Sequence, residues 1–261
     1  MPKDQQTDYL SAVSAPIELA RGLPNAHYTD PATIAEENAA VLEATWAALS
    51  VGAEVPEPGD CKPLEFLGQP LLLLRDGDGQ LRVFQNICRH RGMILVSEPR
   101  KIEGAIRCPY HSWCYAKDGR LVSTPHVGGP GQNSHPAMDR ATLGLVEVRS
   151  HIWRDVVFIN LSGDAPPFEE VHETLLTRWK EVEKPIFQGT YVYRQLKGEE
   201  EEVFPDFEGL SSFWDEGAEY VAVYPNLLLG AQRDHCYAIV LEPVAHDRTR
   251  EHVHLYYAQP D

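Results

Sequence analysis

The spacing of apolar residues predicts two helices. The first begins at Asp30-Pro31, where the aspartate can cap the first turn and proline suits the first helical position. The second extends from Phe168 to Glu183, with apolar residues on one side and charges on the other. Residues 1–29 lack such a period and should run irregularly over another element. The apolar positions behind the two helices are Ile34, Val41, Leu42, Trp46, Leu49, Val171, Leu175, Leu176 and Trp179.

Elsewhere the pattern is that of short β-strands. Residues 70–75 and 81–84 flank Asp76-Gly77-Asp78-Gly79, which is typical of a hairpin. Strand-like stretches at 93–96, 105–107, 146–149 and 156–160, with a hairpin over 115–122, predict a small antiparallel domain that ends near residue 161. Further strands are predicted at 220–224, 227–229, 236–241 and 252–257. The fold class is therefore predicted to be α+β, with domain divisions at 1–54, 55–161 and 162–261.

Composition describes an ordinary globular protein. The chain has 261 residues, of which 43% are hydrophobic, enough for a sizeable core. Its net charge of −16 argues against nucleic acid as a partner. No apolar run approaches the length of a membrane span, and the polar start does not look like a signal peptide. We therefore expect a cytoplasmic protein with no membrane association.

Two short motifs carry the candidate chemistry. Cys88 and His90 form a Cys-x-His arm, Cys108 and His111 form a Cys-x-x-His arm, and 17 residues separate His90 from Cys108. A Rieske [2Fe–2S] cluster needs two thiolates on one iron and two imidazoles on the other. Zinc is the alternative, because Cys₂His₂ also makes a closed tetrahedral zinc site. A zinc finger usually separates its cysteines from its histidines, whereas here each arm mixes them, so the pattern favours the two-iron cluster.

Three cysteines remain after this assignment. Cys61, Cys114 and Cys236 are odd in number and irregular in spacing, which does not describe a disulfide framework. Reduced thiols also agree with a cytoplasmic location. Cys114 follows the tryptophan of the second arm and is interpreted as a small apolar filler.

The sequence CRHRG followed by CPYHSWCYAKDGRL resembles the Rieske motif of the alpha subunits of Rieske non-heme iron oxygenases, the ring-hydroxylating dioxygenase superfamily. The flanking sequence is similar to the branch that oxidises glycine betaine, choline or carnitine, over most of residues 17–160. The resemblance implies that Cys88, His90, Cys108 and His111 bind the cluster in a Rieske domain at 55–161. It also implies that residues 162–261 are part of a catalytic domain in which helices cover an antiparallel sheet.

The resemblance further implies a second centre, a mononuclear non-heme Fe(II) held by two histidines and a carboxylate. In relatives, the histidines come from a segment with an Asn-Trp-Lys motif and a Tyr-His followed closely by a second His, and this chain contains neither. The iron-binding segment is expected to be missing near 184–190, so catalytic residues are unknown and the catalytic domain is incomplete. A natural degenerate homologue, a shortened chain and a longer parent with omitted segments all explain this. The third is favoured, and it predicts a chain break between Lys184 and Tyr191 and a second within 198–204.

Other histidines offer only a weak substitute for that site. His252 and His254 alternate on a predicted strand and so share a face. A chelate with His235 and His246 is conceivable, but exposed histidines at strand ends are the stronger interpretation. We expect His172 to be solvated, and His126, His135 and His151 to be surface or capping residues.

The preferred functional hypothesis is a terminal oxygenase, provided that the parent chain carries the iron site. The resemblance implies electrons from a flavin or ferredoxin-type reductase, O₂ as co-substrate, hydroxylation or demethylation of a small molecule, and a homotrimer. The alternative is a Rieske electron carrier or degenerate homologue without oxygenase activity. A quaternary amine substrate would be held by aromatic faces. The candidates for that role are Phe213, Trp214, Tyr220 and Tyr224.

Overall fold

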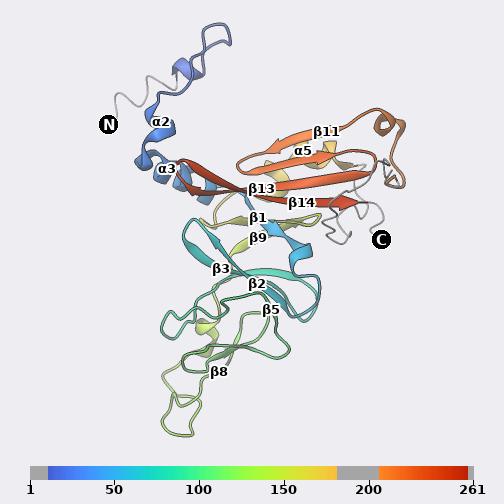
Figure 1. Ribbon diagram of the computed structural model, residues 1–261. Helices are drawn as coiled ribbons and strands as arrows, with labels where there is room; N and C mark the ends of the chain where they lie inside the picture. The colour runs from blue at the N-terminus through green and yellow to red at the C-terminus, as the bar shows by residue number, and fades with distance from the viewer. Residues whose placement is uncertain (1–10, 181–205, 258–261) are drawn as a thin grey trace, which may run out of the picture.

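The computed structural model describes residues 11–180 and 206–257, and it combines short helices with four antiparallel sheets (Figure 1). The predicted α+β class is confirmed. Figure 1 shows the small sheet that contains β8 at the opposite end of the molecule from the sheet that contains β11. The predicted chain breaks, between Lys184 and Tyr191 and within 198–204, lie outside the described residues.

The first helix begins as predicted and then ends early. The Asp30 side chain caps it by accepting a hydrogen bond from the Ala32 N–H at 2.9 Å. The prediction that helical spacing continues through Trp46 and Leu49 is wrong, because Leu49 lies in a strand whose five residues are all buried. A short buried strand and a buried helical segment give the same unbroken apolar run, so periodicity cannot separate them. The elements here are α2 (Ala26–Thr29), α3 (Pro31–Glu37), a π-helix (Asn38–Glu43) and β1 (Ala47–Val51).

Two sheets form the middle of the molecule. One has the strand order β1-β10-β9, and the other has the order β4-β3-β2-β5, with every neighbouring pair antiparallel. The hairpin predicted around Asp76–Gly79 is confirmed as β3–β4, and the strand predicted at 156–160 is confirmed as β10. The bounds are β2 (Asp60–Phe66), β3 (Gln69–Arg75), β4 (Leu81–Gln85), β5 (Arg100–Lys101), β9 (Arg149–Trp153) and β10 (Val156–Asn160).

The third sheet, β6-β7-β8, supports the second metal arm. Its hairpin β7–β8 confirms the prediction over 115–122. The prediction of a strand at 93–96 is wrong, because this stretch contributes only an isolated bridge between Ile87 and Ile94. The strand predicted at 146–149 starts only at its last residue, Arg149. The bounds are β6 (Ile106–Arg107), β7 (Cys114–Tyr115), β8 (Leu121–Ser123) and a 3₁₀ turn at Arg140–Leu143.

The second predicted helix is divided in two at His172. The pieces are α4 (Phe168–Val171) and α5 (Glu173–Arg178). The expectation that His172 is solvated is wrong, because the side chain is buried and its ring stacks on Phe168 at 4.1 Å. His151, expected at the surface, is half-buried and stacks on the same Phe168 ring at 4.0 Å. Burial lowers the pKa of both histidines, so the neutral rings act as apolar packing surfaces.

The fourth sheet confirms the predicted C-terminal strands. Its order is β11-β12-β13-β14, again antiparallel throughout. One face packs over β1, α4 and α5 in a core that includes Trp179, Trp214 and Tyr256. None of the helices in the described part of the chain is long and apolar enough to cross a membrane. The bounds are β11 (Glu219–Val223), β12 (Leu227–Ala231), β13 (His235–Ala245) and β14 (Arg248–Tyr257), preceded by a 3₁₀ turn at Ser212–Asp215.

The side chain of Asn226 joins this sheet to β1. Its Oδ1 accepts from the Ala48 N–H at 2.8 Å, and its Nδ2 donates to the Ala48 carbonyl at 2.9 Å. The same Nδ2 donates to the Leu241 carbonyl in β13 at 3.1 Å. The side chain is buried, so its removal would leave the Ala48 and Leu241 backbone groups without these bonds.

We predict that Asn226→Ala lowers the free energy of unfolding by about 3 kcal/mol, because it leaves several buried backbone groups without partners. Chemical denaturation monitored by tryptophan fluorescence measures this loss. Asn25→Ala is the matched control, because Asn25 is exposed and its side chain makes no capping bond. Equal stability of the two variants would contradict the role of the Asn226 bonds.

Candidate metal centre

The two predicted metal arms are loops with the same backbone hydrogen bonds. In the first, the Cys88 N–H donates to the Met93 carbonyl at 2.8 Å, and the Gly92 N–H donates to the Cys88 carbonyl at 3.0 Å. In the second, the Cys108 N–H donates to Trp113 at 2.8 Å, and the Ser112 N–H donates to Cys108 at 3.1 Å. The two loops therefore present their cysteines in the same way, although the histidine follows two residues later in one and three in the other.

Each loop contains a residue in the left-handed region, four positions after its cysteine. Gly92 has a φ of 70° and adopts this conformation freely. Ser112 has a φ of 58°, which costs a non-glycine residue about 1 kcal/mol or more. The second loop therefore has a strained residue, Ser112, at the position where the first loop has glycine.

The base of the first loop is closed by Asn86, a buried side chain that sequence reasoning did not single out. Its Nδ2 donates to the Val96 carbonyl at 2.7 Å, and its Oδ1 accepts from the Val96 N–H at 3.0 Å. Beneath both loops lies an apolar core that includes Phe84 and Ile106. The loops are therefore held by packing and by hydrogen bonds.

The two cysteine sulfurs are buried near each other. Cys88 and Cys108 are each only 2% exposed, and Cys88 is close enough to Cys108 to affect the pKa of its thiol. Burial, with a further contribution from the Cys88 sulfur, raises the pKa of the Cys108 thiol. The sulfurs therefore form a pair that is shielded from water.

The Tyr115 hydroxyl bridges the loops beside this pair. Tyr115 lies in β7, directly after the second loop, and its oxygen is 3.2 Å from the sulfur of Cys88. The same oxygen accepts a hydrogen bond from the Arg89 N–H at 3.0 Å, which leaves the hydroxyl hydrogen for the sulfur. Sequence reasoning did not single out Tyr115, because its role depends on a contact with Cys88 that forms only on folding.

The two imidazoles form a second pair. The rings of His90 and His111 lie 4.7 Å apart at 74°, and His90 stacks on Trp113 at 4.7 Å and 10°. Tyr110 lies against His111 at 3.7 Å. The Nδ1 atoms of both histidines are buried and have no hydrogen-bond partner among the described residues. Buried polar atoms almost always have partners, so these nitrogens have the environment of ligand atoms.

This donor set fits a two-iron cluster. A pair of sulfurs and a pair of imidazole nitrogens are what the two irons of a Rieske centre require. Burial, with smaller contributions from His111 and Arg91, lowers the pKa of His90, which favours the neutral imidazole that binds metal. In the described residues, no three His, Cys, Asp or Glu side chains are grouped to hold one metal ion. Ligation by Cys88, His90, Cys108 and His111 remains a prediction.

The remaining cysteines lie outside this donor set. All five cysteines of the chain are free and buried. The sulfur of Cys114 donates to the Ser112 carbonyl at 3.2 Å, so Cys114 supports the second loop from within. Burial raises the pKa of Cys61 and of Cys236.

The structure does not bring the four C-terminal histidines together. His235 and His246 lie at opposite ends of β13, an 11-residue strand, and His246 is in the turn that follows it. His252 and His254 share a face as predicted, but His252 bonds to Glu242 at 2.7 Å. His254 is buried, so the interpretation of all four as exposed is wrong for this residue. Neither the chelate nor another iron site is formed by these side chains.

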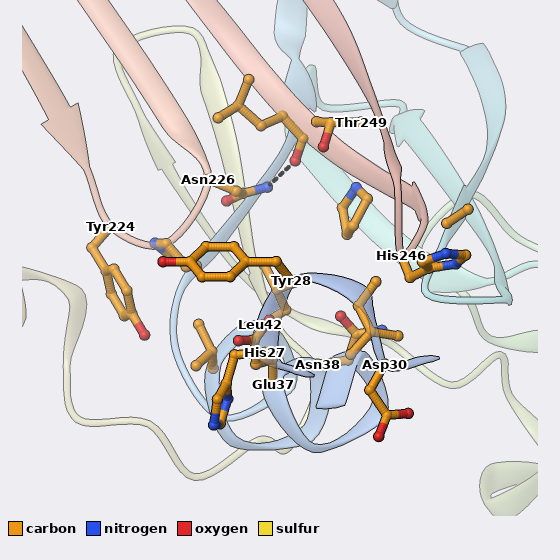
Figure 2. Close-up of a pocket in the computed structure, with 16 residues that line it drawn as sticks. His27, Tyr28, Asp30, Glu37, Asn38, Leu42, Tyr224, Asn226, His246 and Thr249 are labelled. Atoms are coloured by element: carbon orange, nitrogen blue, oxygen red, sulfur yellow. Dashed lines mark hydrogen bonds between the residues drawn. The ribbon is translucent and has the colours of Figure 1, made fainter. Parts of the chain in front are cut away.

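The four aromatic candidates for substrate binding are also dispersed. Trp214 is buried in the core, whereas Phe213 and Tyr220 are exposed at different places on the surface. Of the four, Tyr224 lines a cavity of about 510 Å³ between the N-terminal helices and the C-terminal sheet (Figure 2). Tyr28 from α2, which sequence reasoning did not select, contributes a second ring there.

The lining of this cavity is acidic. The carboxylates of Asp30 and Glu37 line it, and its described lining contains neither lysine nor arginine. Asp30 uses one oxygen to cap α3. Two phenol rings and two carboxylates are suited to an organic cation.

Comparison with known proteins shows which proteins the chain is similar to. Residues 45–138 match the family model described as Rieske [2Fe-2S] domain. The chain is 28% identical over 156 residues to the carnitine monooxygenase oxygenase subunit of Acinetobacter pittii, covering 59% of this chain and 40% of that protein. It is 32% identical over 138 residues to the anthranilate 1,2-dioxygenase large subunit of Acinetobacter baylyi, covering 53% and 28% respectively.

The fold agrees with this relationship. The solved structure of the quaternary ammonium Rieske monooxygenase CntA with gamma-butyrobetaine matches with a TM-score of 0.73 at 18% identity, covering 100% of this chain and 80% of that one. The chain is therefore similar to the alpha subunits of Rieske oxygenases in sequence, and its fold matches that of such an oxygenase. Its sequence matches span less than half the length of these relatives, between 28% and 43%.

We predict that, with a cluster bound at these loops, Tyr115→Phe lowers its reduction potential by about 40 mV. In the wild type, the Tyr115 hydrogen bond stabilises the reduced cluster, which is more negative than the oxidised one, by roughly 1 kcal/mol. For a one-electron couple, about 1.4 kcal/mol corresponds to 59 mV, so loss of the bond corresponds to about 40 mV. Spectroscopic redox titration measures the potential. Tyr110→Phe is the control, because the Tyr110 side chain is exposed and its hydroxyl has no described bond to either sulfur. Equal shifts in the two variants would show that the Tyr115 bond has no specific effect.

Proposed function

We propose that the chain is the terminal component of a Rieske oxygenase, which uses electrons from a flavin or ferredoxin-type reductase for O₂-dependent hydroxylation or demethylation of a small organic molecule. The observation that supports this most is the matched pair of loops, with two buried sulfurs and two unpartnered imidazole nitrogens. A [2Fe–2S] cluster bound by Cys88, His90, Cys108 and His111 would supply one-electron storage and transfer.

The residues around the donor set have separate tasks in this proposal. Trp113 fixes the plane of the His90 ring by stacking, and Tyr115 donates toward the Cys88 sulfur. The apolar core beneath the loops keeps water from the sulfurs. The imidazoles are less buried than the sulfurs, so the histidine side is the side at which electrons would enter and leave.

The mononuclear iron enters the proposal through the family resemblance. No group of three metal-ligating side chains is found in the residues that the structure describes. A second candidate function is a Rieske protein that carries electrons without oxygenating a substrate, because the sequence lacks the Asn-Trp-Lys motif of the iron-binding segment. The homotrimer and the cytoplasmic location are likewise parts of the proposal. One CntA structure is described as giving insights into inter-subunit electron transfer, which supports an assembly of several subunits.

Turnover with labelled dioxygen separates the two functions. We expect that the chain, a reductase of the family and NADH together convert a quaternary amine or aromatic acid into a product that contains oxygen from O₂, as mass spectrometry would show. Cys108→Ser should abolish this turnover. Reduction of the chain by the reductase without any oxygenated product would instead support the electron-carrier function.

The substrate class follows from the cavity beside Tyr224. We propose an organic ammonium compound, because two tyrosine rings and two carboxylates line this space. Relatives named carnitine monooxygenase and glycine betaine monooxygenase oxygenase subunits support this class.

We predict that carnitine or glycine betaine binds more tightly than benzoate, and that Tyr224→Ala weakens binding about fivefold, the effect of losing roughly 1 kcal/mol of cation–π attraction. Isothermal titration calorimetry measures both. Tyr220→Ala is the matched control, because this exposed tyrosine lies in β11, the strand that ends just before Tyr224, and does not line the cavity. A preference for benzoate would overturn the proposed substrate class.

A further inference from the structure

A second cavity, of about 230 Å³, lies between β2 and β14. Its lining comes from β1 and β2 on one side and from β13 and β14 of the C-terminal sheet on the other. His254 of β14 lines this cavity and is 9% exposed. The cavity is therefore a junction at which charges from two parts of the fold meet. The charged and titratable side chains that share the lining with His254 are Glu54, Lys62, Glu65, Glu242, Arg250 and His252.

On the side of β1 and β2, a carboxylate is already paired with a cation. Glu54 lies in the turn after β1, and its Oε1 accepts from Nζ of Lys62 in β2 at 2.6 Å. The Ser50 hydroxyl donates to the other carboxylate oxygen. Burial opposes the charge of Glu54, but the bonds from Lys62 and Ser50 outweigh this effect, and the pKa of Glu54 is lowered. Glu54 and Lys62 are therefore an ion pair at neutral pH, with little net charge to offer His254.

On the side of β14, the other carboxylate is also engaged. Arg250, His252 and His254 alternate along the strand, so they share one face of the sheet. Glu242 of β13 lies opposite Arg250, and its Oε2 is 3.1 Å from Nη1 of Arg250 and 2.7 Å from Nε2 of His252. The ring of His254 makes no hydrogen bond to any residue that the structure describes. No partner therefore fixes the protonation state of His254.

The packing around His254 favours the neutral imidazole. Burial lowers its pKa; the Glu54 carboxylate acts in the opposite direction, and His252 and Lys62 lower the pKa further. A solvated histidine takes up a proton near pH 6.5. Because the packed ring binds a proton less readily than the solvated ring, the packed arrangement is fully stable above about pH 6.5. It loses stability as the pH falls below that value.

We propose that this cavity is an acid-sensitive joint, at which protonation of His254 detaches β14 from the Glu54–Lys62 pair while the metal loops keep their structure. The added charge would lie among two cations and two carboxylates that already have partners, so it is best solvated when β14 moves away. The Asn226 bonds between β1 and β13 contain no titratable group, so the opening is confined to β14. The metal loops lie at the opposite end of the molecule (Figure 1). The inference goes beyond the proposed function and does not depend on it.

Hydrogen exchange followed by mass spectrometry tests the joint between about pH 5 and pH 8. Peptides from β14 are compared with peptides from β3, after correction for the intrinsic pH dependence of amide exchange. Below about pH 6.5, we expect the protection of β14 to fall by up to about tenfold for each pH unit, because opening takes up one proton. The protection of β3 should stay constant. Constant protection of β14, or an equal loss in β3, would overturn the inference.

A substitution at the titratable ring locates the effect. His254→Gln should make the protection of β14 independent of pH over this range, because glutamine does not take up a proton. His235→Gln is the matched control, since His235 lies in the same sheet, in β13, and does not line the cavity. It should lose protection in acid as the wild type does. The same acid loss in His254→Gln as in the wild type would show that another group is responsible, and would refute the joint.

Lys62→Gln is an independent test that leaves β14 unaltered, and it decides the question even if His254→Gln does not fold. Without the Lys62 charge, Glu54 can balance a protonated His254, so acid should reduce the protection of β14 less than in the wild type. Arg120→Gln is the control, because it removes one positive charge from an exposed arginine that does not line the cavity. An unchanged acid loss in Lys62→Gln, or the same change in Arg120→Gln, would rule out the joint.

Discussion

The candidate centre depends on the contact between two loops that are 17 residues apart in sequence. Each loop offers one sulfur and one imidazole nitrogen, so neither can provide a complete donor set. The set exists only because the loops place Cys88 beside Cys108 and His90 beside His111. Tyr115 is a polar link between them, since its backbone belongs to the strand after the second loop and its hydroxyl bonds to the first.

The rest of the fold holds this contact in place. The loops lie on an apolar core that includes Leu72 and Phe84, at the end of the molecule away from the sheet of β11–β14 (Figure 1). That sheet has its own core, and β1 and β10 lie between the two. Asn226 fastens β1 to the C-terminal sheet through bonds to Ala48 and Leu241. A rigid support of this kind favours electron transfer, because the position of the centre is fixed by packed strands.

Local chemistry explains which parts of this architecture could be predicted from the sequence. The Asp30 cap and the hairpin at Asp76–Gly79 depend on neighbouring residues, and both are found. The strand β1 was predicted as helix because its full burial removes the alternation that marks a strand. His172 was predicted as solvated because sequence does not show that Phe168 offers it a ring to stack on.

The candidate site shows the same division. The four donor residues could be named from spacing alone, because the motif is contiguous within each arm. Tyr115 and Asn86 could not, since their importance comes from contacts made after folding, with Cys88 in one case and Val96 in the other. The cavity beside Tyr224 lies between α2 and the C-terminal sheet. The sequence does not show that Tyr28 and Tyr224 line the same space, because only the tertiary fold brings them there.

In each arm, we expect the cysteine sulfur and the histidine nitrogen to bind different irons of a single centre. Mössbauer spectroscopy of the iron-57-enriched protein tests it most directly. We predict two iron signals of equal intensity that differ in isomer shift, because one iron would have only sulfur ligands and the other would have two nitrogens. A single iron environment, or a chain that binds one zinc and no sulfide, would contradict it.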